Sequence, residues 1–192
     1  MEEKTVSLSF DIFEEFTNDL ADRFLQWTLD IESLNIQCEE QDEELPELII
    51  NISSHGGEIV TMRKMLGALD CLPNVKIVRA YGFCDSAALF FFLESTPIRM
   101  AAKYTTLVYH NIIWGVSQSP LYEHEEILSE SKKMQEEIDN MIVNNSKITK
   151  KQLKAKRKED WQISLDEAIE LGIVTYDIKS GDKYTEEEEN GK

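Results

Sequence analysis

Residues 81–88 have the sequence YGFCDSAA. They join residues 75–80, which we expect to be a strand, to residues 87–93, which are apolar throughout. A helix that is apolar on every side is typical of a buried position. The stretch therefore predicts a strand at 75–80 that is joined through Gly82 to a buried helix, with Ser86 at the start of that helix.

Strand and helix patterns alternate on both sides of this unit. The central ones are a strand at 48–52, a helix at 58–72, a strand at 75–80, a helix at 87–93 and strands at 98–100 and 105–109. Short connections of this kind are typical of right-handed crossovers between parallel strands. The carboxyl ends of such strands line one edge of the sheet, where α/β proteins usually bind ligands. The pattern predicts an α/β fold with its site at that edge.

The flanking segments complete one domain. They are a strand at 5–10, a helix within 12–34 with Thr17 or Asn18 as its cap, an acidic loop at 39–44, a long helix at 121–142, a short helix at 149–158, a capping box at 164–167 that starts a helix ending at 171–172, and a closing strand at 173–176. We expect a single domain over residues 1–178. The acidic residues 179–192 predict a disordered tail.

Composition limits the kinds of partner. The 192 residues carry 37 acidic and 20 basic side chains, a net charge of −17, which disfavours binding to nucleic acid. No uncharged apolar run is long enough for a membrane span, and the N-terminus resembles no secretory signal. Three cysteines at no metal-like spacing indicate free thiols in a reducing compartment. We expect a cytoplasmic protein without a metal or a cofactor.

Three features follow successive strands of the predicted sheet: the glycine pair at 56–57, Ser86 and His110. A serine hydroxyl becomes a nucleophile when a base takes its proton and donors hold the oxyanion. His110 is placed to be the base, and the amides of Gly57 and Ala87 suit an oxyanion hole. A base also needs an orienting carboxylate, for which Asp160 is the candidate. The pattern alone does not show whether Asp160 lies close to His110.

Each of these residues also has a structural interpretation. A serine at this position is often an ordinary helix N-cap, and a single histidine such as His110 is often a hydrogen-bonded structural residue. Asp160 follows a basic segment and could be a solvated surface charge, while the paired glycines could form a simple turn. Cys84 could be a cysteine nucleophile, although it lies before the start of the helix.

Six segments occur in a characteristic order: SSHGG at 53–57, GFCDSA at 82–87, LVYH at 107–110, ED at 159–160, SLDEA at 164–168 and LGIV at 171–174. In order and spacing they resemble the proteolytic subunit of the Clp protease, a serine peptidase family that shares its superfold with the crotonases. The resemblance implies a superhelix of repeated strand–strand–helix units. It also implies a protruding handle helix at about residues 119–145.

The resemblance further implies a serine endopeptidase that acts on polypeptides. Ser86 matches the nucleophile, His110 the general base and Asp160 the residue that orients it, while Gly57 and Ala87 match the oxyanion amides. The family forms heptameric rings that stack into a closed chamber, fed by an ATP-driven AAA+ unfoldase, so a homo-oligomer is expected.

Several residues depart from the family pattern. Asp85 stands where the family has alanine, and we expect its carboxylate to point away from His110. His55 replaces a proline, and the substrate-aligning segment at 111–116 is short. Little chain precedes the first strand at Thr5, which puts unfoldase docking in question. The alternatives are an inactive scaffold or regulatory subunit, a crotonase-type acyl-CoA enzyme, or an enzyme with a lysine base.

Overall fold

The structure is a computed structural model that describes residues 6–112, 121–156 and 159–185. Its elements in chain order are β1 Ser7–Ile12, α1 Asn18–Gln41, β2 Glu47–Ser54, α2 Ile59–Asp70, β3 Lys76–Asp85, α3 Ala87–Glu94, β4 Arg99–Ala101, β5 Thr106–Tyr109, α4 Leu121–Asn144, α5 Lys150–Lys156, β6 Trp161–Ile163 and α6 Leu165–Glu170. The alternation of strands and helices agrees with the predicted α/β class.

All six of these strands belong to one sheet with the order β1-β2-β3-β5-β6, and β4 pairs with β3 beside this path. The pairs β1–β2, β2–β3, β3–β4 and β3–β5 are parallel, as the short crossovers predicted. The pair β5–β6 is antiparallel. The carboxyl ends of β2, β3 and β5 therefore lie at one edge of the sheet, as expected.

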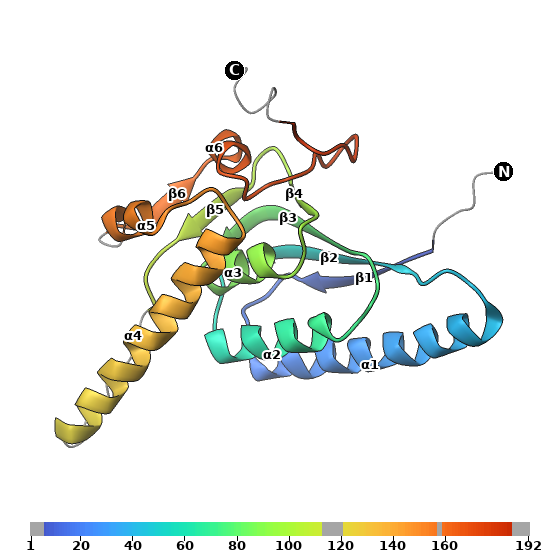
Figure 1. The fold of residues 1–192 in the computed structure, drawn as a ribbon, viewed down its shortest axis with the longest axis horizontal. Helices are drawn as coiled ribbons and strands as arrows, with labels where there is room; N and C mark the ends of the chain where they lie inside the picture. Colours follow the sequence, from blue (N-terminus) through green and yellow to red (C-terminus); the bar gives the residue numbers. More distant parts are fainter. Residues whose placement is uncertain (1–5, 113–120, 157–158, 186–192) are drawn as a thin grey trace.

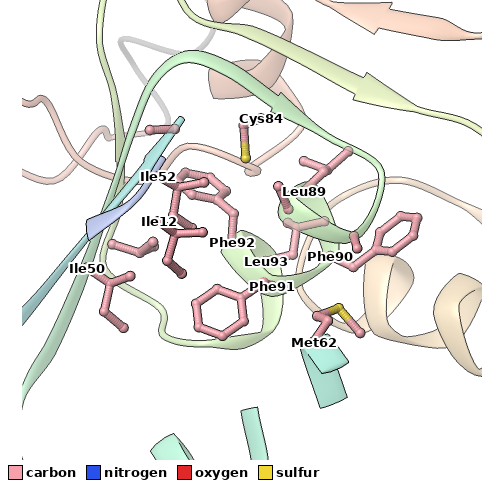
Figure 2. Packing of buried hydrophobic residues seen from close by; sticks show 14 of the residues in the cluster. Ile12, Ile50, Ile52, Met62, Cys84, Leu89, Phe90, Phe91, Phe92 and Leu93 are labelled. Atoms are coloured by element: carbon pink, nitrogen blue, oxygen red, sulfur yellow. The ribbon is translucent and has the colours of Figure 1, made fainter. Parts of the chain in front are cut away.

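Helix α3 is the centre of the core. Every residue from Ala87 to Leu93 is buried, which confirms the helix predicted from the apolar run. Figure 2 shows Phe91 and Phe92 close to the β1 and β2 side chains, with Phe90 directed to another side of the helix. In Figure 1, α1 and α2 lie side by side along one side of the sheet, next to α3. Because α3 is buried on all sides, its position is held by the core, and so is that of Ser86, which directly precedes it.

Helix α1 begins at the predicted cap but is longer than the sequence predicted. It starts at Asn18, where the Thr17 side chain accepts a hydrogen bond from the Leu20 amide at 3.3 Å. It continues to Gln41 and ends at Asp42, which has a left-handed backbone with φ 58°. Half of the expected acidic loop is thus helical, because buried contacts continue along the helix as far as Cys38.

The C-terminal strands were also wrongly predicted. Residues 173–176 form no strand, and Tyr176 makes isolated bridges to Met100 and Lys183 instead. The strand that completes the sheet is β6, whose three residues are too few to give a period-2 signal. β3 also extends to Asp85, five residues beyond the predicted end. The extension of β3 and the added strand β6 determine where Ser86 and Asp160 lie.

Helix α4 leaves the body of the molecule, as Figure 1 shows. Its C-terminal half packs on the core through Ile138 and Ile142, whereas Leu128 is 54% exposed. The first residues of the predicted handle, 119–120, and the last of the predicted tail, 186–192, lie outside the described residues. Within the described part of the chain, no helix has the length and apolar character needed to cross a bilayer.

Candidate active site

Ser86 lies at a strained turn between β3 and α3. Its φ and ψ of 54° and −125° fall in a region that residues with a side chain rarely adopt. Its amide donates to the Val108 carbonyl at 3.0 Å, and its carbonyl accepts from the Phe90 amide at 3.2 Å. Strain of about 1–3 kcal/mol per residue persists where the surrounding structure enforces it, and it gathers at functional sites.

The Ser86 side chain makes no capping hydrogen bond to α3, so the ordinary N-cap interpretation is wrong. The amide of Ala87, the first residue of α3, has no hydrogen-bond partner among the described residues. An unpaired amide at a helix N-terminus is a favourable donor to a negatively charged oxygen.

The glycine pair lies directly against the serine turn. Gly56 and Gly57 have φ of 100° and 140°, where a side chain would be strained. Gly57 forms a parallel bridge with Phe16 in which the Gly56 carbonyl accepts from the Phe16 amide and the Glu58 amide donates to the Phe16 carbonyl. The bridge does not use the Gly57 amide, which remains a second donor beside Ser86.

His110 follows β5 and is half-buried. Its Nδ1 lies 2.7 Å from the Asn111 carbonyl oxygen. A carbonyl oxygen only accepts, so Nδ1 carries the hydrogen, and in the neutral ring Nε2 keeps the lone pair. That tautomer is the one a general base needs. No hydrogen bond joins Ser86 to His110 among the described residues.

Asp160 reaches the neighbourhood of His110 through β6. In the β5–β6 ladder Tyr109 pairs with Trp161, so His110 and Asp160 are the next two positions beyond its end. Residues opposite one another in an antiparallel pair have Cβ atoms roughly 5 Å apart. Asp160 is exposed, and no hydrogen bond to His110 is formed among the described residues. Strand β6, which the sequence patterns did not predict, is thus the element that places Asp160 next to the position of His110.

Ser86, His110 and Gly57 line one cleft of about 550 Å³. The other lining residues come from β1–α1, α2, α3, the segment after β5, and α4: Glu15, Phe16, Thr17, Glu58, Ile59, Val60, Phe90, Ile112 and Met134. No sequence motif marked these residues as one group, because separate elements supply them. The cleft combines an apolar lining with two carboxylates.

Cys84 is not a candidate nucleophile. Its side chain is fully buried in the core near Leu89 and Phe92 (Figure 2). Burial, and secondarily the charge of Asp85, raises the pKa of the Cys84 thiol well above its ordinary value. A thiol that stays protonated and has no access to solvent cannot attack a substrate.

Asp85 points to His55. Its Oδ2 lies 2.7 Å from Nδ1 of His55, and the two residues depart from the family pattern at adjacent places in the sheet. This agrees with the expectation that Asp85 does not compete for His110. Of the segment at 111–116, residues 113–116 lie outside the described residues.

Comparisons with known proteins identify the family and the fold. The sequence model described as Clp protease matches residues 17–180. Among solved structures, a ClpP1 mutant from Listeria monocytogenes is similar with a TM-score of 0.74 and 22% identity, over 88% of this chain and 90% of that chain. At that identity the likeness establishes the fold. No curated protein matches the chain in sequence.

Proposed function

Because this chain belongs to the Clp protease family, we propose that it is a serine endopeptidase with Ser86 as nucleophile. One observation carries the proposal: Ser86 has a strained backbone, its side chain does not cap α3, and it lines one cleft together with His110 and Gly57. A side chain released from capping and held in a costly backbone conformation is what a nucleophile at a strand–helix turn requires.

The chemistry follows from the atoms at the cleft. His110 Nε2 takes the proton of the Ser86 hydroxyl as Oγ bonds to the peptide carbonyl carbon. The amides of Gly57 and Ala87 donate to the oxygen that becomes negative. His110 then passes the proton to the departing amine, the peptide C–N bond breaks, and water hydrolyses the acyl-enzyme by the same steps in reverse order.

Asp160 completes the proposed triad. For this role, Nδ1–H of His110 exchanges its bond to the Asn111 carbonyl for one to the Asp160 carboxylate. The in-register placement of the two residues beside the β5–β6 ladder supports the exchange, since it requires side-chain rotation and no change of fold. A carboxylate stabilises the imidazolium formed during the reaction better than a carbonyl does.

We further propose that the enzyme works as a homo-oligomeric ring, stacked on a second ring through α4. The 24 residues of α4 give a helix about 36 Å long, and its N-terminal half leaves the body of the protomer. The family relationship supports heptameric rings with polypeptide substrates in the chamber, and an AAA+ unfoldase as partner. Three free cysteines agree with a reducing, cytoplasmic location.

The test is covalent labelling with a fluorescent fluorophosphonate, after ultracentrifugation has identified the assembled species. We expect the wild-type assembly to take up one label per protomer, and Ser86→Ala to take up none. Equal labelling of the two proteins, or no labelling of the assembled wild type, contradicts the proposal. Ser95→Ala, at the other end of α3, is a matched control that should label normally.

An inactive scaffold is the second candidate, favoured by the absence of a Ser86–His110 hydrogen bond among the described residues. The same labelling experiment separates the two, since a scaffold assembles into rings without reacting. An acyl-CoA enzyme is disfavoured, because the carboxylates of Glu15 and Glu58 line the cleft where phosphates would approach.

A further inference from the structure

His55 and Asp85 lie next to two parts of the candidate site, the glycine turn and the nucleophile. His55 directly precedes the Gly56–Gly57 turn, and Asp85 directly precedes Ser86. Their side chains are joined by the 2.7 Å contact between Nδ1 and Oδ2. An ionised carboxylate only accepts, so Nδ1 donates. One hydrogen bond therefore links the strand end that carries the Gly57 donor to the strand end that carries the nucleophile.

The link lies where the sheet changes register. Ile52 pairs with Ala80, but Ser54 pairs with Cys84, so two extra residues of β3 are accommodated between these pairs. Gly82, with φ 64°, lies within the extra stretch. Continued by one and two positions, the shifted register sets His55 beside Asp85 and Gly56 beside Ser86. In the unshifted register His55 would pair with Phe83, and Ser86 would lie two positions away from Gly56.

The side chains distinguish these two registers. The shift is an even number of residues, so it keeps every side chain on the same face and is invisible to the burial pattern. His55 contacts both candidate partners: its ring packs on Phe83 with centroids 4.4 Å apart, and its Nδ1 bonds to Asp85. The shifted register sets the two bonded residues directly side by side, and it is also the register that places Gly56 against Ser86.

Asp85 depends on this partner. Its side chain is 15% exposed, and its Oδ1 is buried without a hydrogen bond among the described residues. The His55 side chain is 64% exposed and would be well solvated alone. Loss of His55 therefore leaves a largely buried carboxylate without its hydrogen-bond donor, which is unfavourable, whereas loss of Asp85 leaves a solvated imidazole.

We infer that His55 and Asp85 are positioning residues for acylation. Their hydrogen bond, here called the register lock, holds β2 and β3 in the register that keeps the Gly57 amide and the Ser86 hydroxyl within reach of the same substrate carbonyl group. The inference rests on the proposed function of Ser86, since the lock matters to catalysis only if Ser86 reacts. A displacement of about 1 Å between nucleophile and oxyanion donors slows a reaction by up to about 100-fold. The lock acts on bond formation, so it changes kcat and not KM.

The test uses the assembled full-length protein and the rate constant for fluorophosphonate labelling. We expect Asp85→Ala and His55→Ala each to slow labelling by about 10- to 100-fold. The double variant His55→Ala/Asp85→Ala should label no more slowly than either single variant, because each single substitution already removes the hydrogen bond. Asp85→Asn and His55→Asn keep an acceptor and a donor at these positions, and should recover to within about threefold of wild type. Labelling of Asp85→Ala at the wild-type rate overturns the inference, as does failure of both asparagine variants to rescue.

A matched control comes from the same sheet. The Asn51 amide donates to Asp11 at 2.8 Å across the β1–β2 pair, an exposed cross-strand bond of similar length away from Ser86. Asn51→Ala should label at the wild-type rate. Urea unfolding of each variant shows whether a slow variant has lost stability. Parallel losses of labelling and stability in Asp85→Ala, without any change in the kcat of peptide cleavage by the folded fraction, overturn a positioning role.

Hydrogen exchange separates this inference from the proposed function. The Gly56 amide donates to Ser54 Oγ at 3.1 Å, and the Phe16 amide donates to the Gly56 carbonyl at 2.8 Å. Exchange at these two amides should accelerate by about tenfold in Asp85→Ala and remain unchanged in Asn51→Ala. Unchanged exchange in Asp85→Ala overturns the lock even if the wild type labels at Ser86. If the wild type does not label while exchange responds as expected, the lock exists and the peptidase proposal is what fails.

Discussion

A Cβ atom at Gly56 would lie 2.7 Å from the Cβ of Ser86 and 2.8 Å from the Asp85 carbonyl oxygen. Real Cβ atoms do not approach a neighbour so closely, so only glycine permits this contact between the end of β2 and the serine turn. The close contact between Gly56 and Ser86 therefore places the end of β2, which carries the Gly57 amide, beside the turn that carries the Ser86 hydroxyl.

Gly56→Ala should therefore abolish function. The new methyl group must push Ser86 or the β2 end away, and the φ of 100° adds backbone strain. We expect fluorophosphonate labelling to fall by more than about 100-fold. Gly181→Ala is the control, since it has a φ of 76° but open space around its Cβ position. It should label normally; equal losses in the two variants would assign the effect to backbone strain alone.

Asp160→Asn tests the third member of the triad. An asparagine can hold the His110 ring but cannot stabilise its positive charge. We expect the kcat of peptide cleavage to fall by about 100-fold or more, with little change in KM. Glu159→Gln, the exposed neighbour, provides a charge-matched control. A wild-type kcat in Asp160→Asn would assign the orienting role to the Asn111 carbonyl, which bonds Nδ1 in the structure.

The carboxylates of Glu15 and Glu58 at the cleft predict a charge preference. Peptides with lysine or arginine near the scissile bond should be cleaved with a kcat/KM about two- to fivefold higher than acidic counterparts, the scale of an exposed ion pair. High salt should weaken the preference. The double variant Glu15→Gln/Glu58→Gln should lose it. Glu14→Gln should retain it, because Glu14 pairs with Arg23 and does not line the cleft.

Arg99 predicts a large effect on stability. Its five N–H groups donate to five backbone carbonyls near the ends of three helices, those of Leu93, Thr96, Asn145, Gly172 and Ile173. Burial lowers the pKa of the guanidinium to about 10, so it remains charged at neutral pH, and a cation is favourable at helix C-termini.

Arg99→Lys leaves at least two of these carbonyls without a donor. We expect the free energy of unfolding in urea to fall by about 3–5 kcal/mol. Arg63→Lys is the matched control, because Arg63 forms an exposed ion pair with Glu137 at 3.0 Å. That substitution should cost less than about 1 kcal/mol. Similar losses in the two variants would show that the carbonyl cluster does not depend on the guanidinium.

The three thiols should differ in reactivity and in their effect on pH dependence. Cys71 is exposed and should react with a disulfide reagent at pH 8, whereas Cys38 and Cys84 should react only after unfolding. Cys71→Ser should remove the fast phase.

Burial raises the Cys84 pKa above its ordinary value of 9.0, so the unfolded chain ionises first as pH rises. Stability should therefore decrease above about pH 9, and less steeply in Cys84→Ala than in wild type. Urea unfolding at pH 8 and pH 10 measures the difference, and equal slopes would contradict it.

Local patterns predicted the parts of the fold that depend on nearby residues. The apolar run at 87–93 predicted a buried helix because no face of it can be solvated, and Thr17 was a recognisable cap. The cleft side chains were not predictable, because Phe16, Ile59 and Met134 come from elements far apart in the chain. The proximity of Asp160 to His110 depends on the three-residue strand β6, which carries too little periodicity to be seen.

The sequence by itself determined the α/β class, the order of its strands and helices, and the three strand ends at which a serine, a histidine and two glycines occur. Alternation of apolar residues sets which face of a strand is buried, and this information is local. The tertiary structure decided the register at Ser54–Cys84, and with it the contact between Gly56 and Ser86. A register shift of two residues leaves every buried side chain buried, so the hydrophobic pattern is the same in both registers. Only the pairing of the strands, with His55 bonded to Asp85, distinguishes them.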